Sequence, residues 1–108
     1  MKTITPKELK AKIDKGEDFK LIDVREDYEV AVSMIPGAEH VKLDKITTDP
    51  SVLEDYQDKP IIFTCRSGGR SGVACGIAEA AGFKDVTNLE GGITGWKAEV
   101  DPSLKIYE

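Results

Sequence analysis

Short apolar runs alternate along this chain with segments whose apolar residues recur at helical spacing. Strands are predicted at residues 20–24, 61–64 and 85–89, with a shorter strand at 40–43. The run at 61–64 has the sequence IIFT, which is continuously apolar up to its last residue. Such a run is typical of a strand covered on both faces, as in a parallel sheet.

Helices are predicted between these strands, and the first is the most clearly marked. Thr5 serves as its N-cap, Pro6 suits the first helical position, Glu8 completes a capping box and Gly16 ends the helix. Further helices are expected over residues 26–33, as one or two short helices within 44–58, over 72–81 and in a short segment through residue 96. Because strands and helices alternate, the predicted fold class is α/β, with helices on both faces of the sheet.

Length, charge and cysteine content exclude several classes of protein. The chain has 108 residues, which predicts a single domain over residues 1–108. Its net charge of −5 argues against a nucleic-acid partner, and no apolar run is long enough to span a membrane or to resemble a signal peptide. With two cysteines and one histidine, neither a disulfide framework nor a zinc site is expected. We therefore expect a cytoplasmic protein with free thiols and no metal or cofactor.

The segment CRSGGRS at residues 65–71, called the Cys65 loop below, carries the candidate chemistry. Cys65 follows the buried strand and precedes a helix, so it lies where ligands bind in parallel sheets and where a helix N-terminus favours an anion. Arg66 and Arg70 add positive charge on both sides. Both effects lower the pKa of a thiol, and the thiolate is the nucleophilic form of cysteine.

The glycines of the Cys65 loop indicate an anion-binding backbone. Gly68 and Gly69 permit backbone angles closed to other residues and leave room for a close approach. Successive amides can then point inward around the sulfur as a nest, and the arginines can add forked hydrogen bonds. The sequence therefore predicts a soft nucleophile within a small site for negative charge.

Four segments together resemble a single-domain rhodanese. They are residues 21–26, residues 35–38, the Cys65 loop and residues 89–92 with Trp96, in the order and spacing of that family. The resemblance implies a rhodanese-like fold with a five-stranded, mostly parallel sheet. One departure is visible, because Ser33 and Met34 stand where the family often has Gly-His. That position is usually supportive, so the departure concerns local packing more than chemistry.

The resemblance also implies a thiosulfate sulfurtransferase in which Cys65 is the sulfur-accepting nucleophile. A donor such as thiosulfate would pass its outer sulfur to Cys65, and cyanide or a thiol would accept the sulfur from the resulting persulfide. The substrate-binding residues expected are Arg66, Ser67, Gly68, Gly69 and Arg70, and the supporting residues are Asp23, Arg25 and Ser71. A thioredoxin-like protein or a cysteine desulfurase is the protein partner expected.

Alternative interpretations remain open for the protein and for single residues. A persulfide carrier serving a desulfurase would need the same loop. Cysteine phosphatases and arsenate reductases typically place five residues between cysteine and arginine, whereas four separate Cys65 from Arg70. Asp23 and Arg25 could form a structural ion pair instead of touching substrate, and Cys75 is expected to pack within its helix.

Overall fold

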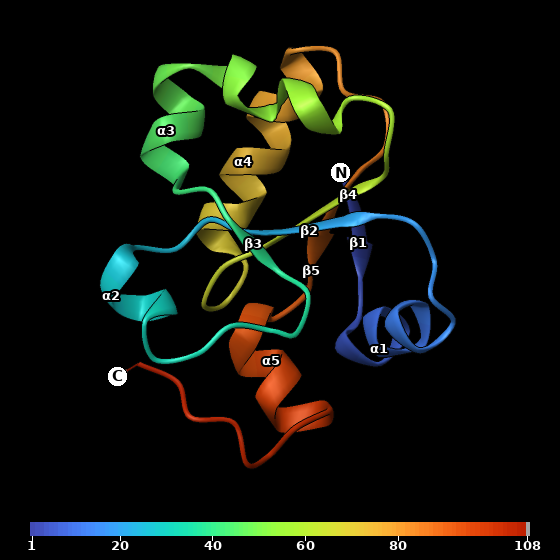
Figure 1. Ribbon diagram of the computed structural model, residues 1–108, viewed down its shortest axis with the longest axis vertical. Coiled ribbons are helices and arrows are strands. Elements are labelled where there is room, and N and C mark those ends of the chain that lie inside the picture. The colour runs from blue at the N-terminus through green and yellow to red at the C-terminus, as the bar shows by residue number, and fades with distance from the viewer. Residues whose placement is uncertain (108) are drawn as a thin grey trace.

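A five-stranded sheet forms the centre of the molecule (Figure 1). The computed structural model describes residues 1–107, and the strand order is β1-β5-β4-β2-β3. The strands are β1 (Lys2–Ile4), β2 (Lys20–Asp23), β3 (Glu39–His40), β4 (Ile61–Thr64) and β5 (Val86–Leu89). Every pairing is parallel, which confirms the α/β class and makes the sheet fully parallel where a mostly parallel one was predicted.

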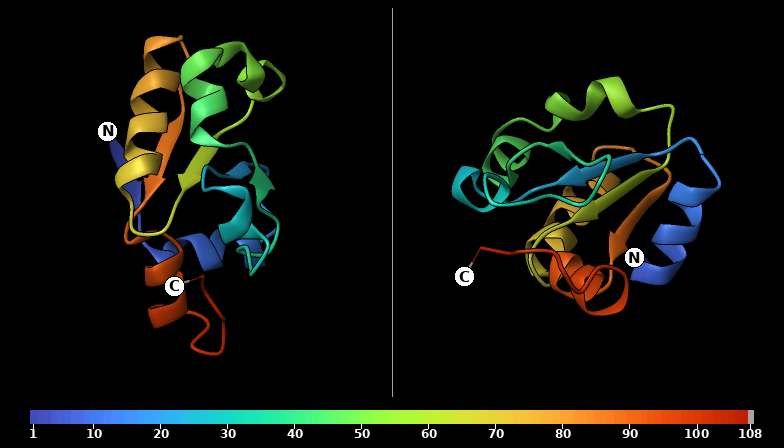
Figure 2. Two further views of the ribbon diagram at one scale, coloured as in Figure 1. Left: turned by 90° about the vertical axis from the view of Figure 1, so that its left-hand side faces the viewer. Right: turned by 60° about the horizontal axis from the view of Figure 1, so that its bottom comes forward.

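Helices cover both faces of this sheet (Figure 2). They are α1 (Pro6–Asp14), α2 (Asp27–Val30), α3 (Leu43–Thr48), a 3₁₀ helix (Pro50–Tyr56), α4 (Gly69–Ala80) and α5 (Gly92–Glu99). Side chains of β4 alternate between two cores, as a strand requires. Phe63 packs in the cluster that includes residues of α3 and α4, and Ile62 packs in the cluster that includes residues of α1 and α5. The strand is therefore buried throughout, as its apolar sequence predicted.

Local sequence signals place α1 correctly. The Glu8 amide donates to Thr5 Oγ1 at 3.2 Å, and the Thr5 amide donates to Glu8 Oε1 at 2.9 Å. These two bonds form the predicted capping box, with Pro6 in the first turn. The amide and the hydroxyl of Thr5 also lower the pKa of Glu8, because hydrogen bonds to its carboxylate favour the charged form.

Several elements differ from the prediction, among them α2, which is shorter than the helix predicted over residues 26–33, and three of the differences have a local reason. β1 was not predicted, because three residues with a single buried side chain carry no recognisable strand pattern. β3 ends at His40 instead of residue 43, since Leu43 already begins α3. α4 begins at Gly69, three residues earlier than predicted, because Gly68 turns the chain with a φ of +113° and serves as its N-cap.

The topology brings the carboxyl ends of β4, β5 and β2 together at one edge of the sheet. Figure 2 (left) shows the arrowheads of β4 and β5 pointing toward the end of the molecule where α5 lies. The Cys65 loop connects β4 to α4 at this end. Across residues 1–107, no helix has the length and apolar character needed to cross a membrane.

Candidate active site

Cys65 lies directly after the central strand, with its sulfur facing the loop that follows. The residue exposes only 1% of its surface. Its Sγ accepts a hydrogen bond from the Gly68 amide at 3.1 Å and another from the Ser71 hydroxyl at 3.2 Å. The thiol is therefore buried yet surrounded by donors, which is the arrangement that a thiolate requires.

These donors decide the charge of the thiol. Burial raises the pKa of Cys65, but hydrogen bonds from Ser71, from the Gly68 amide and from the Ser67 amide outweigh it and lower the pKa below its usual value. The lowered pKa agrees with the expectation from sequence. The contributions that lower it are hydrogen bonds from Ser71 and from loop amides, as the predicted nest suggested, and the charges of Arg66 and Arg70 are not among the main causes. Cys75 shows the opposite case, because burial without such donors raises its pKa to about 12.

Asn88, a residue of β5, organises the loop from its far side. Its Nδ2 donates to the Gly68 carbonyl at 3.0 Å, and its Oδ1 lies 2.6 Å from the Ser71 hydroxyl oxygen. Because Ser71 has one hydroxyl hydrogen, it donates either to Cys65 or to Asn88 at any moment. Asn88 thus holds in place both groups that donate to the sulfur.

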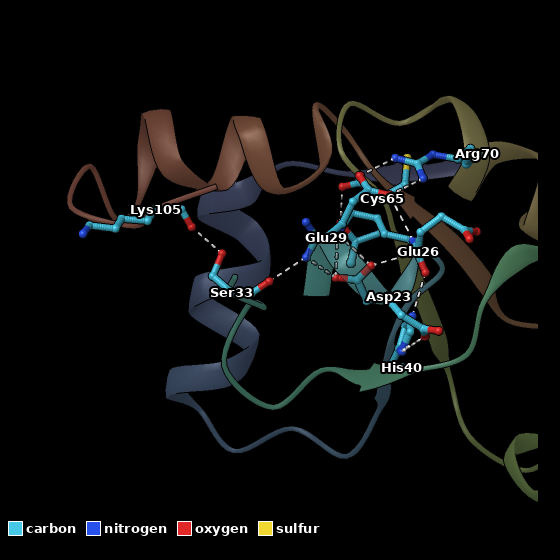
Figure 3. A network of polar contacts seen from close by, with 11 residues as sticks. Asp23, Glu26, Glu29, Ser33, His40, Cys65, Arg70 and Lys105 are labelled. Atoms are coloured by element: carbon cyan, nitrogen blue, oxygen red, sulfur yellow. Dashed lines mark hydrogen bonds and ion pairs between the residues drawn. The ribbon is translucent and has the colours of Figure 1, made fainter. Parts of the chain in front are cut away.

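Arg70 forms a forked ion pair with Glu29 of α2, as Figure 3 shows beside Cys65. Its two terminal nitrogens donate to the Glu29 carboxylate at 2.6 and 2.9 Å. The Arg70 hydrogen bonds hold the pKa of Glu29 at about 2, and Glu29 in turn raises the pKa of Arg70. The expected contact between Arg70 and substrate remains a prediction. Both terminal nitrogens of the Arg70 guanidinium are already bonded to Glu29.

Asp23 and Arg25 form a fully buried ion pair at the end of β2. Arg25 Nε and Nη2 donate to the Asp23 carboxylate at 2.8–3.0 Å, and Nη2 also donates to the Ser33 carbonyl at 2.7 Å. The Ser33 hydroxyl donates to the Lys105 carbonyl, so the position that departs from the rhodanese pattern joins this pair to the C-terminal segment (Figure 3). The geometry favours the structural ion pair that the sequence left open.

The rest of the Cys65 loop lies on the surface, and α5 holds its backbone through hydrogen bonds. Arg66, Ser67 and Gly69 are exposed. The amides of Ile93 and Thr94 donate to the carbonyls of Cys65 and Arg66 at 2.9 and 3.1 Å. With its carbonyls engaged by α5, the loop turns amides toward the sulfur. No group of three or more metal-ligating side chains is found among residues 1–107.

Sequence reasoning did not identify Glu29 or Asn88 as site residues. Glu29 lies 41 positions before its partner Arg70 in the sequence, and Asn88 lies 17 positions after its partner Ser71. Neither residue belongs to a local pattern such as the glycine-rich loop, so only the pairing of β2, β4 and β5 brings them to Cys65. The position of Asn88 near the carboxyl end of a predicted strand was the one available signal.

Comparison with known proteins agrees with this architecture. Residues 5–99 match the family model described as a rhodanese-like domain. The chain is 44% identical over 102 residues to the "Putative sulfurtransferase YtwF" of Bacillus subtilis, covering 94% of this chain and 96% of that protein. It is 34% identical over 93 residues to a sulfurtransferase of Allochromatium vinosum, covering 86% of this chain and 85% of that one. The crystal structure of a rhodanese-like domain protein from Staphylococcus aureus superposes with a TM-score of 0.81, at 34% identity and with full coverage of both chains.

The chain therefore belongs to the rhodanese-like family, as its sequence motifs predicted. The two relatives are named sulfurtransferases, and this chain is a sulfurtransferase in the same general sense.

Replacing Ser71 by alanine tests the hydrogen bond from its hydroxyl to the sulfur. A hydrogen bond to a charged group contributes about 1.5–3 kcal/mol. Its loss in Ser71→Ala should raise the pKa of Cys65 and slow iodoacetamide alkylation at neutral pH by roughly tenfold or more. Ser103→Ala removes an exposed hydroxyl that bonds to Asp101 and serves as the control. Equal alkylation rates in the two variants would contradict the role assigned to Ser71.

Proposed function

We propose that the chain transfers sulfane sulfur from thiosulfate or another persulfide donor to cyanide or a thiol through a persulfide on Cys65. The observation that carries this proposal is the pair of hydrogen bonds to Cys65 Sγ from Gly68 and Ser71. The same donors can hold the negative sulfur of a persulfide between the two steps.

The first step loads the sulfur. The Cys65 thiolate attacks the outer sulfur of thiosulfate, a sulfur–sulfur bond forms to Cys65, and the bond to the sulfonate sulfur breaks. Sulfite leaves with the electron pair of that bond, so Cys65 carries a persulfide anion and no proton has to be supplied. This step needs a reactive thiolate and donors around it, both of which the loop offers.

The second step returns Cys65 to its starting form. Cyanide attacks the outer sulfur of the persulfide and leaves as thiocyanate, while the electron pair of the broken sulfur–sulfur bond returns to Cys65 Sγ. An acceptor thiolate reacts in the same way and becomes the new persulfide. We expect thioredoxin-like proteins or a cysteine desulfurase among the partners, and a reducing compartment such as the cytoplasm, because the loading step requires Cys65 as a free thiolate.

Phosphate-ester hydrolysis is less well supported by the same residues. A phosphatase loop grips its phosphate with a free arginine, whereas both terminal nitrogens of Arg70 are bonded to Glu29. The loop is also one residue shorter than is typical of that chemistry, with four residues between Cys65 and Arg70.

Mass spectrometry of the intact chain tests the proposal directly. After incubation with excess thiosulfate or cysteine persulfide and removal of the donor, the chain should gain the mass of one sulfur atom. Cyanide added afterwards should remove it as thiocyanate. Repeated turnover would indicate an enzyme, and loading followed by slow release would favour the carrier interpretation. Absence of loading by either donor would contradict the proposed function.

A further inference from the structure

The two arginines of the Cys65 loop do not contribute equally to its charge. Arg70 is matched by the carboxylate of Glu29, which is 5% exposed and whose pKa, lowered by the Arg70 hydrogen bonds, is about 2. The carboxylate is therefore charged throughout the neutral range, and the pair adds no net charge to the site. Among residues 1–107, Arg66 is the one loop cation that forms no ion pair, and it is exposed to solvent.

This charge balance separates two classes of sulfur donor. The Cys65 thiolate and the Glu29 carboxylate already balance Arg66 and Arg70. Thiosulfate would bring two further negative charges, with its sulfonate next to the reacting sulfur and only the solvent-exposed Arg66 left unpaired in the loop to meet them. The sulfur–sulfur unit of an organic persulfide brings at most one negative charge, as R–S–S⁻, and none in its neutral form R–S–SH. Electrostatics therefore favours the organic donor.

Access to the thiol points in the same direction. Because Cys65 exposes only 1% of its surface, the donor atoms next to the reacting sulfur must enter a narrow opening. In thiosulfate the neighbouring atom carries three oxygens. In an organic persulfide the neighbouring sulfur carries a single substituent, so this end of the molecule is slender.

An aromatic surface lies near the Arg70–Glu29 pair and can receive the organic part of such a donor. Tyr28 of α2 and Tyr107 pack edge to face, with ring centroids 4.8 Å apart, yet remain 57% and 43% exposed. Tyr28 directly precedes Glu29 in α2, so it lies next to the residue that pairs with Arg70. Exposed aromatic rings bind organic groups well and offer little to a small inorganic anion.

We propose that the preferred donor is an organic persulfide, and that Glu29 sets this preference over thiosulfate by neutralising Arg70. The proposal rests on the proposed function. In the loading step the Cys65 thiolate attacks the outer sulfur of R–S–SH, the sulfur–sulfur bond of the donor breaks, and R–S⁻ leaves with its electron pair. The proton stays on the transferred sulfur, so Cys65 carries –S–SH and no oxidant or reductant is consumed.

The experiment compares kcat/KM for cysteine persulfide with kcat/KM for thiosulfate in the native chain and in variants of α2. In the native chain the ratio should exceed about 10, and Glu29→Gln should lower it by about tenfold, since Arg70 is then free to meet the sulfonate. Glu29→Asp keeps the charge and should keep the native ratio. Asp27→Asn removes a carboxylate of the same helix that pairs with Lys42, and it controls for a general change in charge. Serum albumin persulfide, offered in a parallel arm, distinguishes a protein-borne donor from a small one.

Two results would overturn the inference while leaving the proposed function intact. One is a native chain that uses thiosulfate as efficiently as cysteine persulfide. The other is a donor ratio that Glu29→Gln leaves unchanged or that Asp27→Asn changes equally. If neither donor places sulfur on Cys65, the proposed function itself fails, so the two failures are distinguishable.

Discussion

Cys65→Ser should accept no sulfur from any donor, whereas the native chain gains one sulfur atom. A serine hydroxyl at this position is not ionised at neutral pH and forms no stable bond to a sulfane sulfur, so the loss should be complete. The substitution keeps a small side chain within reach of the Gly68 amide and the Ser71 hydroxyl. Intact-chain mass spectrometry after exposure to cysteine persulfide measures the result.

Cys75 provides the matched control, because it is the other free cysteine of residues 1–107. It is fully buried in α4, and burial raises its pKa to about 12, so almost none of it is thiolate at neutral pH. Cys75→Ala should therefore load sulfur as the native chain does. Sulfur on the Cys65→Ser variant, or loading lost only in Cys75→Ala, would contradict the assignment of the nucleophile.

Gly92→Ala should disrupt the support behind the Cys65 loop and destabilise the fold. Gly92 has a φ of +55°, and a Cβ built there would lie 2.4 Å from the Cys65 carbonyl oxygen and 2.6 Å from that of Arg66. A left-handed residue with a side chain costs about 1–2 kcal/mol, and overpacking adds about 1–3 kcal/mol. We expect the free energy of unfolding, measured in urea, to fall by about 2–5 kcal/mol, with sulfur loading reduced as the loop shifts.

Gly76→Ala is the control for this substitution. Gly76 is exposed within α4, and an added Cβ there would meet nothing within 4 Å. Alanine in an exposed helix interior stabilises by roughly 0.5–1 kcal/mol relative to glycine. If Gly92→Ala unfolds at the same urea concentration as the native chain, the close packing of α5 against the loop is not what holds the loop in place.

Features of the fold that depend only on residues close together in the sequence could be predicted. The capping box of Thr5 and Glu8 lies within four residues, and the buried strand at 61–64 is recognisable from its apolar run. The Cys65 loop is equally local, because a cysteine, two glycines and two arginines lie within residues 65–70, although the helix that follows begins three residues earlier than predicted. Such signals need no knowledge of tertiary structure.

The unpredicted part of the site depends on contacts between distant segments. No residue near Glu29 in the sequence indicates that it will pair with Arg70. The motif around Arg70 is also the same whether its guanidinium is free or bonded to another residue. Asn88 acquires its role only because β5 pairs with β4 and places its side chain next to Gly68 and Ser71. The balance between burial and hydrogen bonding at Cys65 likewise exists only in the folded chain.

The central claim is that the loop lowers the pKa of the Cys65 thiol, and so favours the thiolate, although the residue is buried. The direct test is the pH dependence of iodoacetamide alkylation of Cys65 in the Cys75→Ala background, measured in the folded chain and again in denaturant. The hydrogen bonds from Ser71 and Gly68 predict a lower pKa in the folded chain than in the unfolded one. A folded pKa equal to or above the unfolded value would show that burial dominates, and it would contradict the account.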